Sequence, residues 1–193
     1  HLPMEPTEPV ALNERDMVRV GTDSVELAGI LDRVQAELPS AVGLNNHMGS
    51  RATADVCLMA GLAAELKRRG LAFVDSRTTP DSYALFAMRD AGVPALGRDV
   101  FLDYATGSKT IHDQLARLAR IARQRGWAVG IGHARRATLD VLKEEMPRLA
   151  ENGITFLSAG TLIELLNGGV LLDRLRRRRT TAHRSNINQR RMR

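Results

Sequence analysis

The sequence has little cysteine, few aromatic residues and no long apolar run. A single cysteine, Cys57, excludes an internal disulfide and any cysteine-cluster metal site, and its apolar surroundings predict a small core residue. No apolar stretch approaches the roughly 18 residues of a membrane-spanning helix, and no basic-then-apolar leader opens the sequence. The GxxxxGKS phosphate-binding motif and the GxSxG serine elbow are also missing, which argues against P-loop and serine-elbow chemistry.

Acidic residues are scarce only near the C-terminus. The formal net charge is +6, which by itself would suggest a nucleic-acid partner. Nine arginines and one aspartate lie between Asp173 and Arg193, however, so the rest of the sequence is mildly acidic. We therefore expect one domain over residues 1–169 and a basic, disordered tail over residues 170–193, in which His183 is solvated. Contact of this tail with an anionic surface is the alternative.

The sequence does contain a regular alternation of helical patterns and short apolar runs. Helical spacing of apolar residues predicts helices over residues 23–38, 53–69, 80–91, 108–125, 137–151 and 161–166. Short apolar runs predict strands over residues 41–44, 71–74, 100–102, 127–131 and 154–157. Continuously apolar strands separated by helices are buried on both faces, so the sequence predicts an α/β fold with a parallel sheet, either open or closed into a barrel.

Polar and ionisable side chains stand at the ends of four predicted strands. Because the carboxyl ends of parallel strands meet on one face, we expect these side chains to share a pocket. They are Asn45, Asn46 and His47 after the first strand, Asp75 and Arg77 after the second, Asp99 and Asp103 around the third, and His133 and Arg135 after the fourth.

Each of these residues also has an ordinary structural interpretation. A histidine after a strand is often a loop or capping residue, and Asp75 can cap the turn that follows it. Asp99 and Asp103 can pair with the adjacent arginine or with solvent. The functional interpretation gains weight because His47 and His133 occupy equivalent ends of different strands.

Five segments carry a resemblance to a known family. HLPMEP at 1–6, GLNNHMGSRATAD at 43–55, FVDSRTT at 73–79, RDVFLD at 98–103 and VGIGHARRATLDVL at 129–142 resemble, in order and spacing, the divergent polysaccharide deacetylases, distant relatives of the NodB-type carbohydrate esterases. The resemblance covers residues 1–166. It implies an irregular (β/α) barrel of the NodB or polysaccharide deacetylase type with fewer than eight strands, whose N-terminal strand is missing from this chain.

The same resemblance implies a site that holds a divalent metal, expected to be zinc. His1 and His47 would be metal ligands, and His133 is placed like the general acid of the relatives. Further residues would line the pocket: Asp75 and Glu5 as catalytic candidates, and Asn46, Arg51, Arg77 and Asp103 as substrate-binding candidates. Two departures stand out. The family's Asp-Asp pair, a ligand and a base, precedes the point where this chain starts, and Arg136 replaces an expected proline.

The function implied is metal-dependent hydrolysis of N- or O-acetyl groups on an envelope polysaccharide such as peptidoglycan, in the periplasm or cell envelope. A metal-activated water would attack the acetamide carbonyl, and an imidazolium would protonate the departing amine. A carbohydrate-binding or cell-envelope interaction module that keeps the fold without turnover is the alternative. Nucleic-acid binding through the basic tail is a third and weaker hypothesis, and no membrane span is expected.

Overall fold

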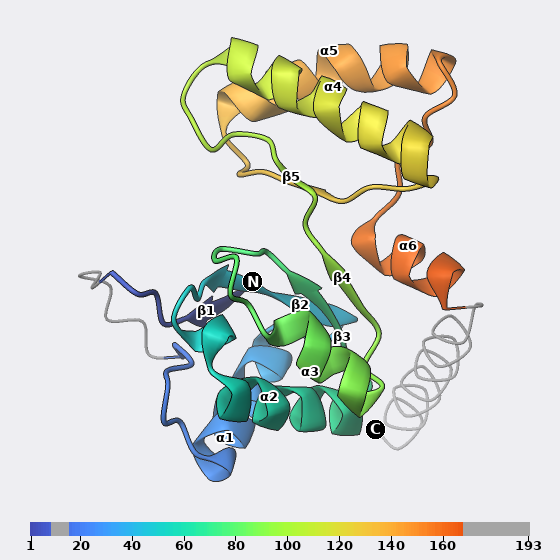
Figure 1. Ribbon diagram of the computed structural model, residues 1–193. Helices are drawn as coiled ribbons and strands as arrows, with labels where there is room; N and C mark the ends of the chain where they lie inside the picture. The colour runs from blue at the N-terminus through green and yellow to red at the C-terminus, as the bar shows by residue number, and fades with distance from the viewer. Residues whose placement is uncertain (9–15, 168–193) are drawn as a thin grey trace, which may run out of the picture.

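The computed structural model describes residues 1–8 and 16–167, which form two lobes (Figure 1). The chain crosses from the first lobe to the second between β4 and β5, and it returns between α5 and α6. The first lobe contains a sheet of four strands in the order β1-β2-β3-β4, with α1, α2 and α3 beside it. The second lobe contains the two-stranded sheet β5-β6 with α4 and α5. Helix α6 lies between the lobes in Figure 1.

The strand pairings are parallel throughout the described residues, which confirms the predicted α/β class. The first sheet consists of β1 (Leu2–Met4), β2 (Gly43–Met48), β3 (Ala72–Asp75) and β4 (Ala95–Gly97), and the second of β5 (Val100–Phe101) and β6 (Gly130–Ile131). Between β4 and β5 the chain changes neighbours. The Arg98 amide donates to the Asp75 carbonyl at 2.9 Å, whereas the Asp99 amide donates to the Val129 carbonyl at 2.8 Å.

The helices begin and end at the signals that the sequence offers. Helix α1 (Ser24–Glu37) starts where the Asp23 carboxylate accepts hydrogen bonds from two backbone amides. Asp55 caps α2 (Val56–Arg69) by accepting one, from the Leu58 amide. Glycines with positive φ follow α2, α3 (Ala84–Ala91) and α4 (Ser108–Arg125). The remaining elements are the short 3-10 helix η1 (Ala52–Ala54), α5 (Arg136–Glu151) and α6 (Ala159–Leu166). None of the described helices is long and apolar enough to cross a membrane.

Each lobe has its own main apolar core, and a third, small apolar cluster brings Val129 of the second lobe together with Ala72, Leu96 and Ile163. The larger core lies between the first sheet and its helices and includes Phe73, Leu62 and Leu31, all fully buried. The smaller core lies under α4 and α5 and is built around Ile111 and Leu115. Burial of these side chains is the main stabilising contribution in each lobe.

Several sequence predictions about elements and burial were wrong. Strand β4 was not predicted, and residues 154–157 form no strand because their backbone pairs with no neighbouring strand among the described residues. Strand β2 starts later than predicted and continues to Met48, so His47 lies inside it. Helix α3 starts at Ala84, because residues 80 and 81 form a turn and residues 82 and 83 are not helical. Cys57 is exposed, since α2 buries the face that carries Leu58 and Leu62.

The predicted boundary between residues 169 and 170 lies outside the described part of the chain, which ends at residue 167. The disorder of the tail and the solvation of His183 therefore remain predictions.

Candidate functional site

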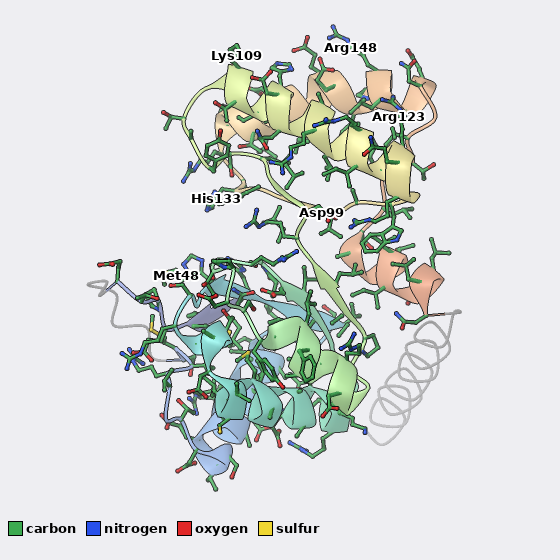
Figure 2. All side chains as sticks on the ribbon, in the orientation of Figure 1. Met48, Asp99, Lys109, Arg123, His133 and Arg148 are labelled. Atoms are coloured by element: carbon green, nitrogen blue, oxygen red, sulfur yellow. The ribbon has the colours of Figure 1, made fainter. Side chains whose placement is uncertain are left out.

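A cavity of about 670 Å³ lies between the two lobes, at the carboxyl ends of the strands. The first lobe contributes His1, the end of β2 and residues 76–78, and the second contributes Phe101 and residues 131–134. Figure 2 shows His133 on the side of the second lobe that faces the first, across from the edge where Met48 lies. Side chains from distant parts of the sequence are thus brought to one cavity.

His1 and His47 form a contacting pair on the first-lobe wall of this cavity. His47 Nδ1 lies 2.9 Å from His1 Nε2, and the ring centroids are 4.7 Å apart. Parallel pairing of β1 with β2, in which Pro3 stands opposite His47, places the two side chains together. Two imidazole nitrogens bound to one tetrahedral zinc lie about 3.3 Å apart, because Zn–N bonds are about 2.0–2.1 Å long. The pair therefore fits two ligand positions of one ion.

A third protein ligand does not join this pair among residues 1–8 and 16–167. Catalytic zinc sites commonly have three protein ligands and one open position. The described residues thus supply part of such a centre.

A second group with ligand-like spacing lies between α4 and α5, outside the cavity. His112, Glu144 and Glu145 have ligand atoms within 4.8 Å of one another. The two carboxylates already share Arg148, at 3.1 Å for Glu144 and 2.8 Å for Glu145. Arg148 lies on the far side of the second lobe from His133 (Figure 2). This group is best described as an ion-pair cluster that joins the two helices.

His133 is held by a buried carboxylate on the second-lobe wall. Asp103 is 3% exposed, and its Oδ1 lies 3.0 Å from His133 Nδ1. Asp103 Oδ2 accepts the His133 backbone amide at 2.9 Å and the Thr138 hydroxyl at 2.8 Å. The carboxylate fixes the ring orientation and leaves Nε2 for the cavity. A buried acid that orients a histidine in this way is a common arrangement in acid–base catalysis.

Asp103 remains ionised in this arrangement. Burial acts to raise the pKa of Asp103, but hydrogen bonds from Thr138 and from the amide and ring of His133 together lower it below its usual value. Asp103 was predicted to bind substrate. The structure instead places it behind His133, with both oxygens engaged by the protein.

The backbone at the first-lobe wall is unusual. Met48 and Arg77 have φ of 55° and 50°, and they are the non-glycine residues with positive φ in the described chain. Both line the cavity. The Met48 carbonyl accepts a hydrogen bond from the side-chain Nδ2 of Asn46 at 2.7 Å and another from the Thr78 hydroxyl at 2.9 Å. Left-handed conformations of such residues cluster at functional sites, where the surroundings hold them in place.

Asn46 braces the ends of β2 and β3. It is fully buried, its side-chain oxygen accepts the Ser76 amide at 2.7 Å, and its carbonyl accepts the Ser76 hydroxyl at 2.7 Å. Asn46 lines the cavity, but these contacts use its polar atoms inside the protein. The structure thus assigns the predicted substrate-binding residue a positioning role.

Three other predicted site residues do not line the cavity among the described residues: Asp75, Glu5 and Arg51. Asp75 is 1% exposed and accepts hydrogen bonds from the Arg77 amide and the Ser82 hydroxyl, both at 2.8 Å. It organises the loop after β3, as the ordinary interpretation of this residue expected. The Glu5 carboxylate accepts a hydrogen bond from the Val20 backbone amide at 2.8 Å. It also pairs with the Arg51 guanidinium at 3.0 Å, so Glu5 and Arg51 form an ion pair beside the site.

Arg98 is a site residue that the sequence did not identify. Its Nε donates to the Ser76 carbonyl at 2.6 Å and its Nη2 to the Arg77 carbonyl at 2.8 Å. Its guanidinium lies 5.3 Å from the centre of the Phe101 ring, which in turn packs at 5.4 Å from His133. The only signal in the sequence was its position at the start of RDVFLD, next to the more conspicuous aspartates.

Comparison with models of known protein families shows which family the chain belongs to. A family model described as divergent polysaccharide deacetylase matches residues 1–163. The chain belongs to this family. Residues of the divergent deacetylase fold that were expected to meet at one face, His1, His47 and His133, are the ones that line the cavity here.

Two curated relatives are similar over most of this chain. The uncharacterized protein YibQ of Escherichia coli strain K12 is 35% identical over 163 residues, which cover 84% of this chain and 50% of the relative. An uncharacterized protein of Haemophilus influenzae strain Rd is 33% identical over 162 residues, covering 84% and 57%. The chain therefore spans about half the length of these relatives.

A solved structure is similar to most of this chain. Uncharacterized protein ATU2773 from Agrobacterium tumefaciens C58 matches with a TM-score of 0.79 and 24% identity, over 83% of this chain and 66% of that one. This likeness shows the fold.

Arg136, which replaces the proline expected in divergent deacetylases, leaves the local fold intact. It is the first residue of α5, a position that proline favours because no backbone donor is needed there. The Arg136 Nε donates to Asp140 one turn later, at 2.8 and 3.0 Å. The helix that follows His133 therefore forms without the proline.

Asp99 has a structural role in the same region. It forms a bidentate ion pair with Arg125 and accepts the Val129 amide at 2.8 Å. The partner is an arginine 26 residues later rather than the adjacent Arg98 that the sequence suggested.

Proposed function

We propose that this divergent deacetylase is a metal-dependent hydrolase that removes N- or O-acetyl groups from an envelope polysaccharide. One observation supports this proposal most strongly. A pair of imidazoles spaced like metal ligands, His1 and His47, faces the same cavity as a histidine oriented by a buried carboxylate, His133 with Asp103. A metal held by imidazoles can activate water and polarise a carbonyl, and a nearby acid–base histidine can protonate the leaving group, which together are sufficient for hydrolysis of an amide or ester.

His1 and His47 would hold the ion, and imidazole nitrogen is one of the donors that zinc commonly takes in proteins. When bound, such an ion lowers the pKa of a coordinated water toward about 7 and polarises the acetyl carbonyl. The described chain supplies the other half of the chemistry. His133 Nε2 faces the cavity, and its proton would go to the departing amine nitrogen as the carbon–nitrogen bond breaks. Asp103 would stabilise the imidazolium before that transfer.

Expulsion of an amine as a free anion is prohibitive, so this proton transfer has a larger effect for N-acetyl than for O-acetyl groups. The acetylated polysaccharides that would serve as substrates lie in the cell envelope. The proposal accordingly places the protein in the periplasm or envelope.

The second candidate is a carbohydrate-binding module on the same fold without turnover. One observation favours it: the described residues supply two metal ligands and no carboxylate that lines the cavity. A two-histidine site binds zinc more weakly than a three-ligand site, and the described residues place on the cavity wall no carboxylate that could act as a general base.

Acetate release and metal content together separate the two candidates. We expect the purified protein to bind about one equivalent of zinc and to release acetate from acetylated chitin oligomers or peptidoglycan fragments. His47→Ala should lose both properties, whereas His133→Ala should keep the metal and lose acetate release. His112→Ala, outside the cavity, is the matched control and should change neither. Sugar binding without acetate release at any zinc concentration would support the binding module.

A further inference from the structure

The cavity is lined by cationic side chains and by no carboxylate among the described residues. Arg77 and Arg98 both contribute to its wall. The nearest carboxylates, Asp75 and Asp103, are buried behind the wall and have their oxygens occupied by the protein. The two guanidinium charges give this part of the cavity wall a positive potential that attracts anions.

Arg77 and Arg98 differ in their contacts with the protein. Arg98 is fixed, because two of its nitrogens donate to the carbonyls of Ser76 and Arg77 and its plane lies over Phe101. Arg77 is exposed, and within the described residues its guanidinium has no hydrogen-bond or ion-pair partner. Arg98 therefore holds the segment that presents Arg77, whose five donors are available for a ligand.

The proximity of these two cations is unfavourable in the protein alone. Burial lowers the pKa of Arg98, and the positive charge of Arg77 lowers it further, while Asp75 acts in the opposite direction. Arg77 also has φ of 50°, which the hydrogen bond from its amide to Asp75 maintains. Like charges held together on a strained backbone are expected where an anionic ligand completes the arrangement.

We propose that Arg77, supported by Arg98, is an anion-binding subsite, and that the substrate is an acidic glycan whose carboxylate pairs with Arg77. This inference rests on the proposed deacetylase function, since it names the class of polysaccharide that the same cavity accepts. A guanidinium binds a carboxylate or a phosphate through two parallel hydrogen bonds, so the shared chemistry is a planar or tetrahedral oxyanion on the sugar. Neutral acetylated glycans lack this contact.

Binding measured by calorimetry with three probes tests the proposal. The probes are a neutral N-acetylglucosamine tetramer, a tetramer of alternating N-acetylglucosamine and N-acetylmuramic acid that carries carboxylates, and inorganic phosphate. We expect the acidic tetramer to bind at least about tenfold more tightly than the neutral one. Competition by phosphate at millimolar concentration would indicate a phosphate-bearing glycan, and its absence would favour the carboxylate.

Variants that change one charge isolate the subsite. Arg77→Gln should weaken binding of the acidic tetramer about tenfold to a hundredfold and leave the neutral tetramer unchanged. Arg77→Lys should restore part of the loss. Arg120→Gln, which removes the same charge from α4 outside the cavity, should have no effect on either probe. The fall in affinity with added salt should also be steeper for the wild type than for Arg77→Gln.

Equal binding of the acidic and neutral tetramers, no measurable binding of the acidic tetramer at millimolar concentration, or equal effects of Arg77→Gln and Arg120→Gln would each overturn the subsite. If the protein has no deacetylase activity but the subsite exists, the result is different. In that case the acidic preference and its dependence on Arg77 persist, but neither the wild type nor His133→Ala releases acetate.

Discussion

The two lobes hold their histidines in different ways. In the first lobe His47 lies within a strand of a four-stranded sheet, over a core that includes the fully buried Leu62 and Phe73. In the second lobe His133 follows a strand of two residues, and hydrogen bonds to Asp103 fix its position. Packing thus positions the proposed metal-ligand pair, whereas a buried polar network positions His133, the proposed acid–base residue.

The second lobe is also the more open of the two. A cavity of about 760 Å³ lies beneath α4 and α5, lined mainly by aliphatic side chains that include Leu115, Leu118 and Leu142. Leu157 and Leu165 are 46% and 64% exposed nearby. Loosely packed regions open with lower free energy than dense cores. We therefore expect the acid–base side of the site to be the more dynamic side.

Matched truncations of leucine test this difference in packing, and they have the largest expected effect. Leu62→Ala should reduce the free energy of unfolding by about 4–5 kcal/mol, because the first-lobe core cannot relax around the cavity. Leu115→Ala should cost about 2–3 kcal/mol, because the side chain already borders an open cavity. Urea denaturation measures both values. A loss at Leu115 as large as that at Leu62 would contradict the comparison.

Removing the charge that orients His133 tests the polar network. Asp103→Asn should lower the rate of acetate release about a hundredfold or more, because an amide does not stabilise the imidazolium as a carboxylate does. Asp99→Asn is the matched control, since this aspartate pairs with Arg125 outside the cavity. It should leave the rate within about twofold of the wild type. Similar losses in both variants would assign the effect of Asp103 to general destabilisation.

The pH dependence of stability provides a smaller effect that belongs to the second lobe. Because the pKa of Asp103 is lowered in the folded protein, its ionised form stabilises the fold above the ordinary aspartate value of about 3.9, and this stabilisation is lost as pH falls through the folded pKa. Urea unfolding at about pH 6 and about pH 3 should show a stability difference between wild type and Asp103→Asn that shrinks at the lower pH. A constant difference would count against the assignment.

The smallest expected effect concerns one hydrogen bond in the same network. Thr138→Val removes the hydroxyl that donates to Asp103 and should cost about 1 kcal/mol of stability, with a rise in the pKa of Asp103. Nuclear magnetic resonance titration of the carboxyl group measures the shift. An unchanged Asp103 titration would show that the hydroxyl contributes nothing to the charge of this group.

Most of the fold was predictable from the sequence because periodicity and capping residues are local signals. The limits of α4, Ser108–Arg125, match the prediction because a clear apolar stripe ends at Gly126. Strand β4 was missed because three residues give too short a pattern, and residues 154–157 have an apolar run but no pairing partner. Pairing is a property of the tertiary structure, which a local pattern does not report.

The site was predictable only in part, for the same reason. The rule that parallel strands end on one face brought His47 and His133 to one cavity, together with His1. The same rule placed Asp75 in the pocket, but its oxygens accept hydrogen bonds from its own loop. The rule did not distinguish Asp103 from the other strand-end residues, although Asp103 is the residue that orients His133. Hydrogen-bond partners depend on side-chain directions, which sequence position alone does not determine.

The proposed metal at His1 and His47 lies close to His133, and paramagnetic broadening tests this placement most directly. With one equivalent of Cu²⁺ bound, we expect the ring signals of His1, His47 and His133 to broaden while those of His112 stay sharp. The variant His47→Ala should abolish the effect on His133. Broadening of His112 with a sharp His133 would place the metal at the cluster with Glu144 and Glu145 instead, and would contradict the proposed site.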